Sequence, residues 1–361
     1  MGFLDRKILL GFGVSTLIYL ISIAVYVYVV KLKSDLVVQY TISPSGTFVP
    51  SNCSRYAFVP FRIGAGAGHH VADYVFSIAL AIAVHGNVAF EASNKFDYDG
   101  KHGNTSWIVK FLNMDDGDAY VGDLLQHGYK MVDVESWSGA IHQSKFACNA
   151  IFRVRDDQCD AAYGGTGDCF SELKGAYESA KWILREKFSR TTFRPKSYRF
   201  SSSFFNVAWH LRTGDKKLHG KDVRFFKTVL MQVSSALEGF PVRHYFFYEG
   251  HRLPHEFEFL KDLGVPNATF VSGMDPGETM FHFVNANMLV GTGSSFAITA
   301  QLVSWKTIFL HTEPKEGGFY GVYETSEVVR VTRDGMILDS RAALRARATL
   351  AWKRYGSTVI P

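Results

Sequence analysis

The chain has 361 residues and a formal net charge of +5, from 39 Lys and Arg against 34 Asp and Glu, and 47% of its residues are hydrophobic. This mild charge, without a compact basic and aromatic motif, is no evidence for nucleic-acid binding, and no nucleic-acid partner is predicted. The length suits two modest domains.

A membrane-spanning helix is the first predicted element. The run from Ile8 to Val30 contains no charged residue, and at a rise of about 1.5 Å per residue it spans a hydrocarbon core of about 30 Å. The alternative is a cleaved signal peptide, which has a shorter apolar stretch and a small-residue cleavage site, whereas Lys31, Leu32 and Lys33 follow here. No later segment is both long and apolar enough, so a single crossing is predicted.

The orientation of this helix depends on the rest of the chain, because basic residues flank it almost equally on both sides. Three sequons begin at Asn52, Asn104 and Asn267, and they would accept glycans in a secretory lumen. The four cysteines include Cys148, Cys159 and Cys169, whose spacing indicates a disulfide-bonded loop; a reduced, buried set is the alternative. Together these features favour a lumenal body, the type II arrangement.

The chain then divides into predicted segments. These are a cytoplasmic tail at 1–7, the anchor at 8–30, a stem at 31–60, an N-terminal α/β domain at 61–188, a linker at 189–203, a Rossmann-like domain at 204–340 and a basic C-terminal helix at 341–361. The N-terminal domain opens with a glycine-rich turn, a helix from Val71 to Val84 and a strand from Asn87 to Glu91. The basic residues of the last helix are interpreted as a solvated face.

The second domain shows a regular alternation of short apolar runs and helical patterns. Strands are predicted at 205–210, 243–248, 268–272, 287–291 and 306–311, and helices at 222–238, 254–262, 278–286 and 295–304. This alternation is typical of a parallel, doubly wound sheet. In such sheets ligands bind beyond the carboxyl ends of the strands, so the loops there are where functional residues are expected.

The first such loop follows the strand at 205–210 and reads His210-Leu211-Arg212-Thr213-Gly214-Asp215-Lys216. Arginine can bind two phosphate oxygens at once, and Lys216 adds a second positive charge, so the pair could neutralise a leaving diphosphate. The alternative interpretation is a solvated basic loop.

The second loop runs from Leu289 to Phe296, where a strand breaks into small residues before a helix begins. Free amides and hydroxyls at Gly293, Ser294 and Ser295 would face an anion. The alternative is that a serine only caps the helix and the glycines only form the turn.

A third motif is the glycine loop from Gly64 to Val71, which includes Gly66, Gly68 and His69. It opens a helix without matching a phosphate loop or a dinucleotide fingerprint. Adjacent histidines point in different directions on a helix, so no metal site is expected here.

These three motifs occur in this order in the superfamily of α1,2-, α1,6- and protein O-fucosyltransferases, and the chain most resembles the α1,6 branch. The resemblance covers short blocks between about residue 61 and residue 311. It implies an α/β, GT-B-like fold of two Rossmann-like domains facing a cleft, the first on the acceptor side and the second binding GDP-fucose. It also implies transfer to a glycan or glycoprotein by an inverting mechanism without a metal or other cofactor.

The resemblance also implies site residues, with Arg212 on the donor diphosphate and Glu249 near the nucleoside. The full set of implied donor-binding residues is Gly66, Gly68, His69, His210, Arg212, Lys216, Glu249, Gly293, Ser294 and Ser295. With such a body in the lumen, Ile8 to Val30 is predicted to be a signal anchor of the Golgi or another secretory-pathway membrane.

The chain departs from the family pattern at two places. Thr213 stands where the family often has a second arginine, which leaves open a transferase for another nucleotide sugar. No acidic base follows Lys216 as in the α1,6 branch, so His219 and Asp222 are the candidate bases, and each could equally be an ordinary loop residue. The missing base also leaves open an inactive, membrane-tethered protein that binds nucleotide sugars or glycans.

Overall fold

The computed structural model describes residues 54–60, 67–91, 107–154, 168–213, 220–250, 252–291, 294–312 and 328–355. The predicted span from Ile8 to Val30 and the sequons at Asn52 and Asn104 lie outside these residues. Among the described residues, no helix has the length and apolar character needed to cross a membrane. All described elements belong to one unit, Val49–Pro361.

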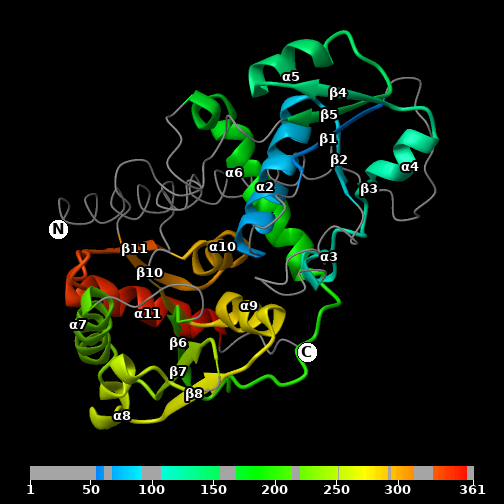
Figure 1. The fold of residues 1–361 in the computed structure, drawn as a ribbon. Helices are drawn as coiled ribbons and strands as arrows, with labels where there is room; N and C mark the ends of the chain where they lie inside the picture. Colours follow the sequence, from blue (N-terminus) through cyan, green and yellow to red (C-terminus); the bar gives the residue numbers. More distant parts are fainter. Residues whose placement is uncertain are drawn as a thin grey trace, which may run out of the picture. The chain divides into compact units, whose positions relative to one another are not determined.

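The N-terminal part of this unit contains a five-stranded parallel sheet (Figure 1). Its strands are β1 (Arg55–Phe58), β2 (Asn87–Phe90), β3 (Ala119–Tyr120), β4 (Lys130–Val134) and β5 (Ala150–Val154), in the order β3-β2-β1-β5-β4. Its helices are α2 (Ala67–Ala83), α3 (Trp107–Phe111), α4 (Val121–Gln126), α5 (Trp137–Ser144) and α6 (Asp168–Ser189). Strand β1 is central, although the sequence predicts a stem there, because a strand of four residues is too short for its alternation to stand out from a loop.

The C-terminal part contains a six-stranded sheet, in which every neighbouring pair of strands is parallel. Its strands are β6 (Phe205–Leu211), β7 (Val242–Tyr248), β8 (Ala268–Ser272), β9 (Met288–Gly291), β10 (Ile308–Thr312) and β11 (Val328–Val331), in the order β11-β10-β9-β6-β7-β8. Its helices are α7 (Gly220–Ala236), the 3₁₀ turn η3 (His255–Phe257), α8 (Phe259–Asp262), α9 (Pro276–Asn285), α10 (Ser295–Val303) and α11 (Arg341–Tyr355). The predicted α/β class with parallel sheets is confirmed, and β11 is an additional strand.

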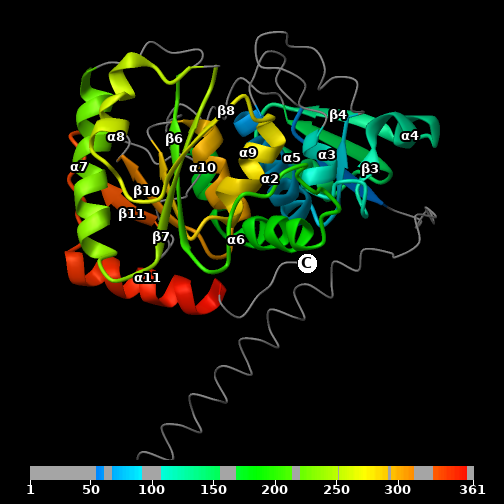
Figure 2. The same ribbon diagram turned by 90° about the horizontal axis from the view of Figure 1, so that it is seen from below.

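Strand β6 is buried at all seven positions, as expected for a parallel strand covered on both faces. Neighbouring side chains of a strand point to opposite faces. Trp209 accordingly joins the core beneath α7 and α11, whereas His210 faces α9 and α10. Figure 2 shows α7 and α8 on one side of the strands and α9 and α10 on the other.

Helices α2, α6, α9 and α10 contribute to one hydrophobic core that contains residues from both sheets. Helix α2 packs against α6 and α10. The guanidinium of Arg185 in α6 donates from Nε to the carbonyl oxygen of Leu302 in α10 at 3.0 Å, and Trp182 meets Trp305 edge to face at a ring distance of 3.9 Å. The helices that follow β1 and β9 are therefore held in direct contact.

The predicted linker contains no helix or strand between α6 and β6, but its backbone is anchored to α9. The amide of Lys196 donates to Glu278 Oε1 at 3.1 Å, and the amide of Arg199 donates to His282 Nε2 at 3.1 Å. Since His282 Nδ1 contacts the carbonyl oxygen of Glu278 at 2.7 Å, the ring must be neutral with its proton on Nδ1. Burial lowers the pKa of His282, which favours this neutral form.

A buried ion pair joins α6 to the loop before β3. Lys187 Nζ lies 3.1 Å from Asp118 Oδ1, and the hydroxyl of Tyr74 in α2 donates to the other carboxylate oxygen. Burial raises the pKa of Asp118 to about 6, although Lys187 and Tyr74 both lower it. This cluster connects α2, α6 and the residue that precedes β3.

Candidate functional site

In the second sheet, the order in which successive strands are added reverses between β6 and β9. From β6 the chain proceeds through β7 to β8 on one side, and α9 then returns it to β9, β10 and β11 on the other side. Strands β6 and β9 are neighbours, with His210 paired in register to Gly291. This order has a topological switch point at β6 and β9, and ligands of such sheets bind in the crevice at the carboxyl ends of those two strands.

The carboxyl end of β6 and the residue that follows the strand bring two of the predicted site residues to this crevice. His210 is buried, and its ring centre lies 5.3 Å from that of Phe283 and 5.9 Å from that of Phe296. Arg212 follows the last residue of β6 and is half-buried. The aromatic contacts fix the histidine against α9 and α10, and the arginine stands one residue beyond the strand, at the edge of the sheet.

The segment after β9 enters α10 from the same edge. Ser294 is buried and occupies the N-cap position, but its side chain makes no capping hydrogen bond. The Ser294 hydroxyl therefore does not act as the cap of α10. Ser295 is the first residue of α10.

Gly291 allows α10 to approach β9 closely. A Cβ atom added at this glycine would lie 2.9 Å from Cβ of Ala297, closer than side-chain carbons normally approach. We expect Gly291→Ala to lower the free energy of unfolding by about 2 kcal/mol, because α10 must move away from the strand. The measurement is urea unfolding, with Gly122→Ala as control, since a Cβ there meets nothing within 4 Å. Equal stability of the two variants would contradict the close-packing role.

The hydroxyl of Thr213 connects the loop after β6 to the end of β7. It donates to the carbonyl oxygen of Glu249 at 2.9 Å and accepts from the amide of Glu249 at 2.9 Å. Glu249 follows the last residue of β7 and is exposed. The sequence alone identifies Thr213 only as a departure from the arginine of the family; its contact with Glu249 depends on the pairing of β6 with β7.

The glycine motif of the first sheet is more helical than predicted. Helix α2 begins at Ala67, so Gly68 and His69 lie in its first turn, and not in a loop. Gly68 is buried and His69 is half-buried. The helix begins before Val71, the first large apolar residue, because the small residues of this turn fit in a buried position. Ser77 fixes α2 to the end of β1, since its hydroxyl accepts from the amide of Val59 at 2.8 Å.

The remaining predicted site residues cannot be placed in this geometry. Gly66, Lys216, His219 and Gly293 lie outside the described residues, and Asp222 and Ser295 lie in helices without described side chains. Within the described part of the chain, no group of three or more His, Cys, Asp or Glu side chains is arranged to hold a metal ion. The metal-independent mechanism and the candidate bases therefore remain predictions.

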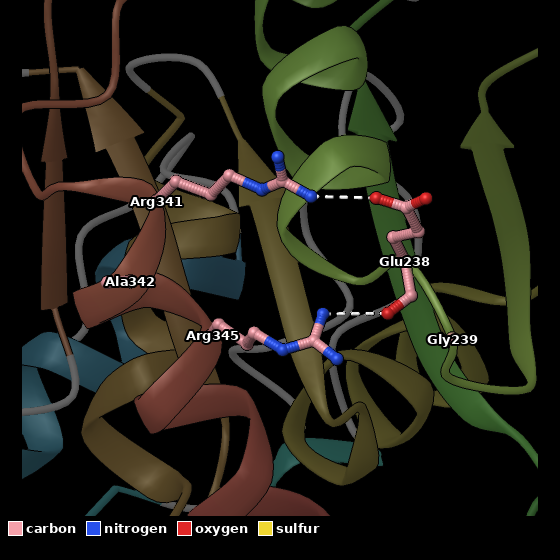
Figure 3. Close-up of a pocket in the computed structure, with 5 residues that line it drawn as sticks. All are labelled: Glu238, Gly239, Arg341, Ala342 and Arg345. Atoms are coloured by element: carbon pink, nitrogen blue, oxygen red, sulfur yellow. Dashed lines mark hydrogen bonds and ion pairs between the residues drawn. The ribbon is translucent and has the colours of Figure 1, made fainter.

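A surface hollow lies between the end of α7 and the start of α11. It is lined by Glu238, Gly239, Arg341, Ala342 and Arg345 (Figure 3). Arg341 Nη2 lies 2.7 Å from Glu238 Oε2, and Arg345 Nη1 donates to the carbonyl oxygens of Glu238 at 2.7 Å and Ala236 at 3.1 Å. Carbonyl groups at a helix C-terminus attract cations. These arginines are exposed, as predicted, and they also contact the end of α7.

No family model matches the chain, and no curated protein matches it. Among solved structures, it is similar to a glycosyl transferase of family 9 from Veillonella parvula DSM 2008, with 10% identity, a TM-score of 0.41, and coverage of 85% of this chain and 100% of that chain. It is similar to fucosyltransferase NodZ from Bradyrhizobium, with 11% identity, a TM-score of 0.38, and coverage of 74% and 97%.

The chain is also similar to the E. coli heptosyltransferase WaaC with ADP, with 10% identity, a TM-score of 0.40, and coverage of 82% of this chain and 99% of that chain. Similarity at such low identities and TM-scores does not indicate activity. The architecture is established by the strand order of the two sheets. What the comparisons report is structural similarity to glycosyltransferases.

Proposed function

We propose that this chain is a glycosyltransferase that transfers fucose from GDP-fucose to a hydroxyl of a glycan or glycoprotein. The observation that carries the proposal is the adjacency of β6 and β9 at the switch point, since it brings Arg212 and Ser294 to one sheet edge. A guanidinium and a helix N-terminus together suit a diphosphate. The order of the sequence motifs, which resembles that of the fucosyltransferase superfamily, supports the choice of donor.

The proposed reaction is a single displacement with inversion. A base, for which His219 and Asp222 are the candidates, takes the proton of the acceptor hydroxyl. The hydroxyl oxygen attacks the anomeric carbon of fucose, the bond from that carbon to the diphosphate oxygen breaks, and GDP leaves with the electron pair. Arg212 and Lys216 would stabilise the charge that develops on the departing diphosphate, with His210, Ser294 and Ser295 beside it.

The proposed setting is the lumen of the Golgi or another secretory compartment, with Ile8 to Val30 as the anchor. Two observations support it. Cys148 is disulfide-bonded, as is usual in an oxidising compartment. Asn267 of the third sequon is exposed in the turn before β8, where a glycan would meet solvent.

The test is a donor screen on the purified full chain with candidate glycan acceptors, in which released nucleoside diphosphate is measured. GDP-fucose is expected to give turnover, and UDP- and ADP-sugars are expected to give none. Turnover with another nucleotide sugar alone would support the second candidate, a transferase for that donor, because Thr213 stands where the family often has a second arginine. Binding of donors without transfer or hydrolysis would identify a binding protein instead.

A further inference from the structure

The hydroxyl of Thr213 continues the hydrogen bonding between β6 and β7 beyond their last paired residues. The register of these strands ends with Leu211 paired to Tyr248. Glu249 is the next residue after β7, and its amide and carbonyl groups both bond to the Thr213 hydroxyl at 2.9 Å. A single side chain therefore satisfies the donor and the acceptor of one residue, as a paired strand would.

This contact fixes the spacing between two charged residues at the crevice. Arg212 directly precedes Thr213 and follows β6, and Glu249 follows β7, the next strand of the sheet. Threonine suits this role because its β-branched side chain has a restricted χ1 angle. The backbone positions of Arg212 and Glu249 are thus coupled through one hydroxyl group.

The strand order indicates what Glu249 would bind. Strands β6, β7 and β8 correspond to the first three strands on one side of the switch point. In dinucleotide-binding sheets of this order, an acidic residue about 20 residues beyond the phosphate loop bonds to the ribose hydroxyls while the phosphates lie at the first strand. Glu249 stands at the carboxyl end of the second strand, next to the one that carries Arg212.

We propose that Thr213 is a positioning residue for the donor nucleotide: it holds Glu249 at the distance from Arg212 at which the carboxylate binds the ribose while the guanidinium binds the diphosphate. This inference rests on the proposed function. Both hydrogen bonds of the hydroxyl are solvent-exposed, so their loss affects stability little. Loss of these hydrogen bonds instead weakens nucleotide binding and recognition of the ribose.

The test measures dissociation constants of GDP and 2′-deoxy-GDP by calorimetry on the full chain. Wild-type protein is expected to bind GDP about tenfold more tightly, from one hydrogen bond between the 2′-hydroxyl and a carboxylate. Thr213→Val removes the hydroxyl and keeps the branched shape, and it should bring this ratio close to one. Thr213→Ser retains the hydroxyl and should keep the ratio. Thr349→Val is the matched control, since the Thr349 hydroxyl bonds within α11, to the carbonyl oxygen of Arg345.

A double-mutant cycle with Glu249→Gln completes the test. If Thr213 acts through Glu249, adding Thr213→Val to Glu249→Gln should weaken GDP binding no further, and independent, additive losses would overturn the proposal. An unchanged ratio in both Thr213→Val and Thr213→Ala, or an equal loss for both nucleotides, would also overturn it. In those cases the proposed function stands, whereas a wild-type chain that binds no GDP would overturn both.

Discussion

Replacing Arg212 by alanine is expected to lower the rate of sugar transfer about a hundred- to thousand-fold, the usual loss when a group aimed at developing charge is removed. Arg212 lies at the carboxyl edge of the sheet where β6 meets β9. The departing diphosphate gains negative charge in the transition state, and a guanidinium can bind two of its oxygens. The rate constant kcat/KM with GDP-fucose is the measurement.

The fold should survive this substitution, because Arg212 lies beyond the end of β6 and outside the hydrophobic cores. A suitable control is Arg190→Ala, which removes another partly exposed arginine, one with a surface ion pair to Asp116 at 3.5 Å. Surface pairs of this kind contribute little to stability. Wild-type turnover of Arg212→Ala would show that the diphosphate is bound elsewhere.

His244 is expected to make the protein less stable in acid by about 3 kcal/mol between about pH 7 and pH 4. The side chain is buried in β7, and its Nδ1 accepts from the indole Nε1 of Trp209 at 3.1 Å. Burial lowers the pKa of His244 from 6.5 to about 4. Between these two values the unfolded chain binds a proton that the folded chain does not. Its contribution is therefore complete above pH 6.5 and is lost as the pH falls through about 4.

The measurement compares urea unfolding of the wild type and His244→Asn at several pH values. The Asn amide oxygen can accept from Trp209 and does not titrate, so the variant should lose about 3 kcal/mol less on acidification. A comparison of two variants is needed because Asp118, with its raised pKa, acts with the opposite sign. Parallel pH profiles for the two proteins would show that His244 is not the group responsible.

The sequence predicts the second sheet closely because each of its strands is a short apolar run between helical patterns. Strand β8 has the predicted bounds, and β6, β7, β9 and α10 end within about two residues of theirs. Buried parallel strands need apolar residues on both faces, so their sequences stand out locally. The first sheet is less visible, because β1 and β2 have four residues each and β3 has two.

The sequence by itself predicts that Arg212 and Ser294 follow the ends of strands, since each comes shortly after an apolar run. Only the tertiary structure decides that these two ends are neighbours, because the path of α9 back across the sheet sets β9 beside β6. It also decides that Thr213 bonds to Glu249 and that the Ser294 hydroxyl does not cap α10. Strand order and hydroxyl partners depend on contacts between residues far apart in the chain, and local composition and periodicity do not encode them.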